Sequence, residues 1–93
     1  MIIGVLLLDL HVPSAHSLKD RRAVIKSLKD RLRNRFNIAI AEVDATEKWQ
    51  RSTLGVSTLG DHRDQVDAVL DHVTDWLRMS PTIALIRAER DYR

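Results

Sequence analysis

The residues with the clearest chemical potential are cationic side chains that repeat along one short stretch. Eight Lys or Arg residues lie between positions 19 and 35, against two Asp residues. Five of the cations recur at intervals of three and four, which places them on one face of a helix: Lys19, Arg22, Lys26, Lys29 and Arg33. Cations in such a row can contact successive phosphates of a nucleic acid and release its counterions. We call these five residues the basic stripe and predict from them a phosphate-binding surface for RNA.

The same pattern is also compatible with an ordinary solvated helix face. Four carboxylates recur at similar intervals later in the chain, and we call them the acidic stripe: Asp64, Asp67, Asp71 and Asp75. If the two stretches are neighbouring helices, cations and carboxylates can pair with each other and leave no surface for a ligand. The sequence leaves these two interpretations open.

A second candidate site lies in a loop that combines an acid, an indole, an amide and a guanidinium: Asp44, Trp49, Gln50 and Arg51. Trp49 and Arg51 can stack on a base or grip a phosphate. The alternative is structural, with Trp49 closing the end of the core and Arg51 pairing with Glu42 or Asp44. An enzyme built on this loop is a weaker alternative, which a deep pocket beside the loop would favour.

Other chemistries lack the residues that they need. The chain contains no cysteine, which excludes disulfides, thiolate zinc sites and cysteine nucleophiles. The four histidines do not have the spacing of metal ligands, and the three glycines form no phosphate-binding motif. His16 and Ser17 are adjacent, a poor arrangement for a base and its nucleophile. We therefore predict a non-enzymatic protein with no cofactor and no metal site.

Hydrophobic periodicity predicts the elements that carry these residues. Strands are expected at 2–12, 37–44, 51–59 and 82–89, and helices at 17–36 and 61–79. Ser17 with Asp20 three residues later predicts the start of the first helix. Arg21 and Arg35 fall on the apolar side of that helix near its ends, where long stems can reach water. The order β-α-β-β-α-β predicts one α+β domain over residues 1–93, a ferredoxin-like sandwich of a four-stranded antiparallel sheet with both helices on one face.

The first strand also indicates a possible interface. Its even positions are apolar around Gly4 and are expected to face the helices. Ile3, Val5 and Leu7 then form an apolar patch on the open face, which either a partner such as a second copy covers or the twist of the sheet and the loops shield. The alternative function is therefore a protein-interaction or homodimerisation module that uses the open sheet face and has no nucleic-acid role.

Charge and the N-terminal segment bear on location. The net charge of +2 is mild, so only the local asymmetry of the stripe points to nucleic acid. Met1 leads into an apolar run that is too short for a membrane span, and Asp9 and His11 make it unlike a signal peptide. We predict a cytoplasmic protein without membrane association.

Four stretches resemble the YlxP family of bacterial proteins of unknown function: residues 16–22 (HSLKDRR), 33–37 (RNRFN), 41–44 (AEVD) and 49–51 (WQR). The resemblance covers nearly the whole chain and implies a ferredoxin-like fold. Because the family has no established activity, it implies no catalytic residue. Its genes commonly lie near those for transcription elongation, translation initiation and ribosome maturation, which implies a link to RNA or ribosomes. Asp20 stands where the family often has Glu, and the last strand is poor in aromatic residues.

Overall fold

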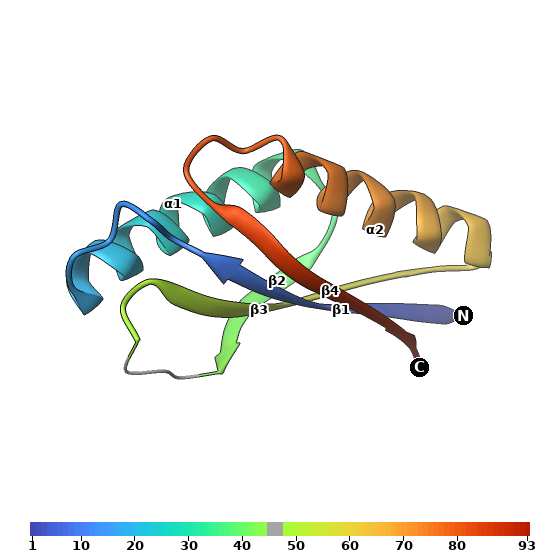
Figure 1. Cartoon of the computed structure of the whole chain (residues 1–93). Coiled ribbons are helices and arrows are strands. Elements are labelled where there is room, and N and C mark those ends of the chain that lie inside the picture. The colour runs from blue at the N-terminus through green and yellow to red at the C-terminus, as the bar shows by residue number, and fades with distance from the viewer. Residues whose placement is uncertain (45–47) are drawn as a thin grey trace.

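The computed structural model of the chain describes residues 1–44 and 48–93. Its elements follow the predicted order, and their boundaries lie within three residues of the predicted ones: β1 (Ile2–His11), α1 (Leu18–Arg35), β2 (Ala39–Asp44), β3 (Arg51–Gly60), α2 (Arg63–Arg78) and β4 (Ala84–Tyr92). Figure 1 shows the two helices on one side of the sheet.

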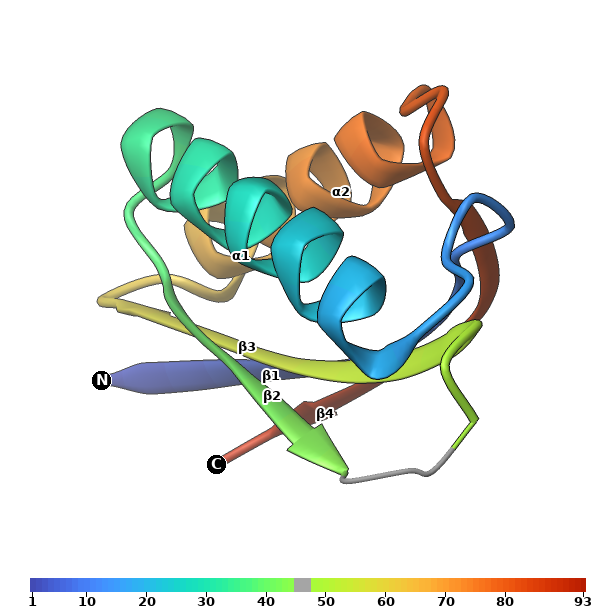
Figure 2. The ribbon, with the colours of Figure 1, turned by 90° about the vertical axis from the view of Figure 1, so that its left-hand side faces the viewer.

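The four strands form one antiparallel sheet in the order β2-β3-β1-β4. β1 pairs with β3 along its whole length, from Ile2 opposite Gly60 to His11 opposite Arg51. β2 and β4 are therefore the two edges, and the view along the sheet in Figure 2 shows both helices above it. This is the predicted ferredoxin-like α+β sandwich. Among the described residues, no helix is long and apolar enough to cross a membrane.

The core lies between the sheet and the two helices. Its fully buried side chains come from both strands at the centre of the sheet and from both helices: Leu6, Leu8, Leu10, Leu54, Val56, Leu28, Leu32, Val66, Leu70, Val73 and Leu77. The even positions of β1 thus face the helices, as predicted. Gly4 is needed for this packing, because a Cβ atom there would lie 2.8 Å from Cδ1 of Leu70.

The start of α1 is fixed by reciprocal hydrogen bonds. Ser17 Oγ accepts the backbone N–H of Asp20 at 3.0 Å, and Asp20 Oδ2 accepts the backbone N–H of His16 at 3.0 Å. The first bond satisfies a donor that the first helical turn leaves without a partner, and the second ties the residue before the N-cap to the helix. The predicted N-cap is confirmed, with Asp20 acting as the returning carboxylate.

The open face of the sheet carries the apolar patch that the alternation of β1 predicted. Ile3 and Val5 are half-buried, and 42 % of Leu7 is exposed. Val43 lies at a register shift between β2 and β3, and a Cβ atom on Gly55 would lie only 2.7 Å from its Cγ1. The Val43 side chain therefore covers the backbone of β3 and extends the patch across the open face.

Candidate nucleic-acid interface

The basic stripe lies on the outer side of the helix layer. α1 packs on β2 and β3, whereas α2 packs on β1, β3 and β4. Four stripe residues line a groove of about 370 Å³ between α1 and the edge strand β2, with Glu42 on its other side: Arg22, Lys26, Lys29 and Arg33. The stripe therefore faces away from α2, along the β2 edge of the molecule (Figure 2).

Internal contacts involve only part of the stripe. Asp30 accepts a hydrogen bond from Lys26 Nζ at 2.9 Å and lies 3.4 Å from Arg33 Nη1. Arg33 Nη2 also donates to the carbonyl oxygen of Ile40 on β2, at 3.0 Å. Within the described part of the chain, the other stripe cations form no ion pair: Lys19, Arg22 and Lys29. These three charges are available to a ligand without the loss of an ion pair to a described residue.

The environment of Asp30 reflects this excess of positive charge. The hydrogen bond from Lys26 lowers the pKa of Asp30 below its ordinary value, and the charges of Lys26, Arg33 and Lys29 lower that pKa further. One carboxylate thus stays ionised among several cations. A phosphate placed in the same groove would experience the same attraction.

Two carboxylates of the acidic stripe, Asp67 and Asp71, have partners on β4 at the opposite edge of the sheet. Asp71 lies 2.6 Å from Arg90 of β4, and Asp67 lies 3.3 Å from the same guanidinium. Asp67 also pairs with Arg63 at 3.7 Å and accepts a hydrogen bond from the hydroxyl of Tyr92, which lowers its pKa. Among the described residues, no ion pair joins α1 to α2. Pairing between the two stripes, which the sequence left open, is therefore absent from this part of the chain.

Arg21 differs from its predicted role. Only 4 % of its side chain is exposed, so its charge does not reach water. Arg21 Nη1 donates to the carbonyl oxygens of Lys48 at 3.1 Å and Arg51 at 3.2 Å, and Nη2 lies 3.8 Å from Glu42 Oε1. Burial is tolerated because acceptors and an opposite charge lie within reach of the guanidinium. The signal in the sequence was an Arg on the apolar side of the helix, but its acceptors come from distant segments.

Trp49 does not close the core, as one interpretation of the loop predicted, because 49 % of the residue is exposed. Arg51 does not pair with Glu42, since that carboxylate lies beside Arg21 and accepts a hydrogen bond from Ser52 Oγ at 2.5 Å. The predicted pairing of Arg51 with Asp44 lies outside the described part of the structure, because the Asp44 side chain is not described. The structural interpretation of Trp49 was therefore wrong, and this indole is free to contact a ligand.

Gln50 has a structural role that its place in the candidate loop did not indicate. Its Nε2 donates to the carbonyl oxygens of Pro13 and Ala15, both at 3.3 Å. Its own backbone oxygen accepts the N–H of Val12 at 2.8 Å. Gln50 therefore joins the segment before β3 to the loop after β1.

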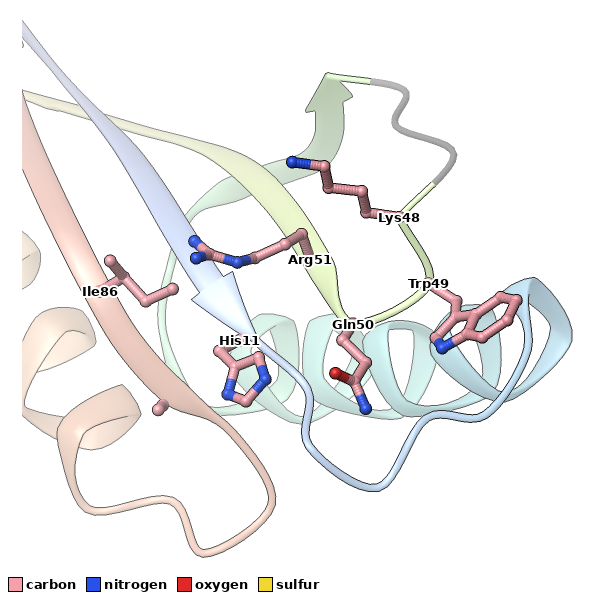
Figure 3. A pocket seen from close by; sticks show the side chains of 7 residues that line it. His11, Lys48, Trp49, Gln50, Arg51 and Ile86 are labelled. Atoms are coloured by element: carbon pink, nitrogen blue, oxygen red, sulfur yellow. The ribbon is translucent and has the colours of Figure 1, made fainter.

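A pocket of about 770 Å³ lies beside this segment on the open face of the sheet (Figure 3). It is broad and open to solvent, and its lining comes from the ends of three strands and the segment before β3: His11, Lys48, Trp49, Gln50, Arg51, Ala84 and Ile86. Neither His11 nor the β4 residues were predicted as site residues, because their proximity depends on strand pairing. No carboxylate is among these lining residues, and no cluster of described residues could hold a metal ion.

Comparisons with known proteins identify a family without a known activity. Residues 3–90 match the model of a family described as a protein of unknown function, DUF503. The chain is 35 % identical over 69 residues to the uncharacterized protein YlxP of Bacillus subtilis (strain 168), across 74 % of this chain and 75 % of that protein.

Solved structures with a similar backbone include two de novo designed proteins. Ferredog-Diesel is 12 % identical, with a TM-score of 0.47 over 98 % of this chain and 83 % of its own. LFR1 1, described as having a ferredoxin fold, is 13 % identical, with a TM-score of 0.49 over 100 % of this chain and 85 % of its own.

Proposed function

Because this chain belongs to the DUF503 family of proteins of unknown function, we propose its role from its own surface: it is a non-enzymatic accessory factor that associates with RNA or ribosomes in the cytoplasm. The basic stripe binds the phosphate backbone. The observation that carries the proposal is the position of the stripe along the β2 edge, where Asp30 and Glu42 are the described acids that share its groove.

The shape of the stripe supports contact with a backbone. A helix rises about 1.5 Å per residue, so the stripe extends over about 21 Å with a cation roughly every 5 Å. Long Lys and Arg side chains at this spacing can reach several phosphates of one strand. Such contacts position a nucleic acid but read no bases.

We do not expect the middle of the sheet to read bases. RNA-recognition motifs stack bases on aromatic side chains in the middle of the sheet. The four aromatic residues of this chain lie elsewhere: Phe36 follows α1, Trp49 precedes β3, Trp76 is in α2, and Tyr92 ends β4 facing α2. We therefore expect weak discrimination among sequences.

The test is the salt dependence of binding to ribosomal RNA, measured by fluorescence anisotropy. A triple variant with Lys19→Gln, Arg22→Gln and Lys29→Gln removes three cations that form no ion pair with described residues. If each contacts a phosphate of single-stranded RNA, the slope of log K against log salt becomes shallower by about 2, at about 0.7 per contact. The affinity should fall similarly for all RNA sequences.

A second triple variant is the charge-matched control. Arg78→Gln, Arg87→Gln and Arg93→Gln remove the same charge from residues at the end of α2 and on β4 and the C-terminus. Their effect should be small, because only the overall charge changes. Equal slopes in the two triple variants would show that net charge, and not the stripe, governs binding.

The apolar patch favours a second candidate function, self-association through the open sheet face. Leu7 and Val43 are 42 % and 52 % exposed there. Sedimentation equilibrium would then show a dimer that dissociates on Leu7→Ser and is unaffected by the substitutions in the stripe. A monomer at all accessible concentrations would leave this candidate without support.

A further inference from the structure

The pocket on the open face is built where three strands end side by side. In the sheet, His11 of β1 lies opposite Arg51 of β3 on one side and Ala84 of β4 on the other. Paired residues of neighbouring strands point to the same face. Figure 3 shows the guanidinium of Arg51 directed across β1 toward Ile86, with His11 at the end of β1 below it.

The charge of the lining selects an anion. Lys48 and Arg51 contribute two cations and His11 an imidazole, and no carboxylate is among the described residues that line the pocket. Within the described part of the chain, no acid pairs with the guanidinium of Arg51. A guanidinium without a carboxylate partner is suited to bidentate contact with a phosphate.

The rest of the lining selects a planar, partly apolar group. Trp49 and Ile86 are each 49 % exposed at this pocket, and Ala84 lies beside them. Figure 3 places the indole of Trp49 on the side of Gln50 away from Ile86. An exposed indole stacks on any nucleic-acid base, because every base has a π-face. The volume of about 770 Å³ lies in the range of small-molecule sites.

Hydrogen bonds to Arg21 and Gln50 hold the loop that carries the indole. Arg21 donates to the carbonyl oxygens of Lys48 and Arg51, which bracket Trp49 and Gln50. Gln50 in turn is fixed to Pro13 and Ala15. A binding loop that is held in place before the ligand arrives loses less conformational entropy on binding.

We propose that this pocket is a nucleotide-binding site, in which Arg51 and Lys48 hold a phosphate and the indole of Trp49 stacks on the base. The nucleotide is either free or the unpaired 5′-phosphorylated end of an RNA strand. The second source rests on the proposed function, whereas the first does not. The site lies on the open face of the sheet, and the basic stripe lies on the helix layer.

The two tryptophans provide a test with an internal control. Trp76 is on α2, where its ring lies 5.2 Å from the guanidinium carbon of Arg31, and it does not line the pocket. In ¹H–¹⁵N spectra, assigned with Trp49→Phe, titration with 5′-nucleoside monophosphates should shift the indole N–H signal of Trp49 saturably and leave that of Trp76 unchanged. Arg51→Gln should weaken this binding at least tenfold, whereas Arg87→Gln, with the same loss of charge, should not.

A second titration separates the two sources. It uses a 5′-phosphorylated RNA hexamer, and both ligands are also added to the variant that lacks Lys19, Arg22 and Lys29. If mononucleotides bind this variant as tightly as they bind the native protein, the pocket is a site for the free nucleotide, even if the stripe binds no RNA. A shift of Trp49 with the hexamer alone assigns the site to an RNA end.

Three results would overturn the proposal. They are an unmoved Trp49 signal with both ligands, equal shifts of the two indole signals, and an equal response to inorganic phosphate alone. Spectra of Arg51→Gln that retain the native dispersion exclude unfolding as the cause of lost binding.

Discussion

Arg21→Met removes the buried guanidinium that links α1 to the segment before β3. Three groups lose a partner: the carbonyl oxygens of Lys48 and Arg51, and the carboxylate of Glu42. Methionine has a similar length and fills most of the same space, so the substitution tests the polar contacts and not the packing. We expect a large loss of stability from a single residue at the surface end of the core.

The magnitude follows from the burial of the Arg21 guanidinium beside a partly exposed carboxylate. Removing one partner of a buried ion pair costs about 3–5 kcal/mol, because the other charge remains buried. Glu42 is 25 % exposed and lies 3.8 Å from the guanidinium, which favours the lower end of that range. A loss of about 3 kcal/mol lowers the melting temperature of a domain of this size by at least about 12 °C.

Urea denaturation followed by circular dichroism measures this loss. Arg22→Met is the matched control, because the neighbouring residue is exposed and its loss should change stability by less than about 0.5 kcal/mol. Adding Glu42→Gln to Arg21→Met should recover about 1 kcal/mol, since the stranded carboxylate becomes neutral. If Arg21→Met and Arg22→Met unfold at the same urea concentration, the guanidinium does not hold this segment.

Three further predictions concern the fold. Gly4→Ala should cost about 1–3 kcal/mol in urea denaturation, because the new Cβ would lie 2.8 Å from Leu70 Cδ1; Gly60→Ala, with its nearest contact at 3.4 Å, should cost less. Ser17→Ala should lower the free energy of unfolding by about 1 kcal/mol through loss of the N-cap, measured in the same way. The hydrogen bond from Tyr92 lowers the pKa of Asp67 below 3.8, so its ionised form stabilises the native state above that pH and the effect disappears as the pH falls through the lowered pKa. Asp67→Asn should therefore reduce the acid sensitivity of the melting temperature below about pH 4.

Periodicity was enough to predict the order of the elements because most of them have a regular apolar pattern. The even residues of β1 and the stripe of α1 that includes Leu28 and Leu32 are buried as expected. The end of β4 was predicted three residues too early, since its last residues are charged or polar. In the fold, Arg90 and Tyr92 face α2 and contact Asp67, so their polarity is matched by a distant helix and not by water.

The candidate site could be predicted only where it depends on local spacing. The basic stripe follows from helical geometry alone, whereas the partners of its charges depend on where α2 and β4 lie. The same limit explains Arg21, whose acceptors are 27 and 30 residues away. It also explains the pocket, where the pairing of β1 with β4 places His11 opposite Ala84. Trp49 was identified from its residue type, but its exposure depends on the path of the loop.

The two stripes lie on different sides of the helix layer, so the molecule has an electric dipole despite its net charge of only +2. Near a polyanion, the torque on this dipole turns the β2 edge toward the negative charge before any contact forms. At physiological ionic strength the torque acts only within a screening length of about 8 Å. Salt should therefore slow association by randomising the angle of approach, even though the net attraction of the protein is weak.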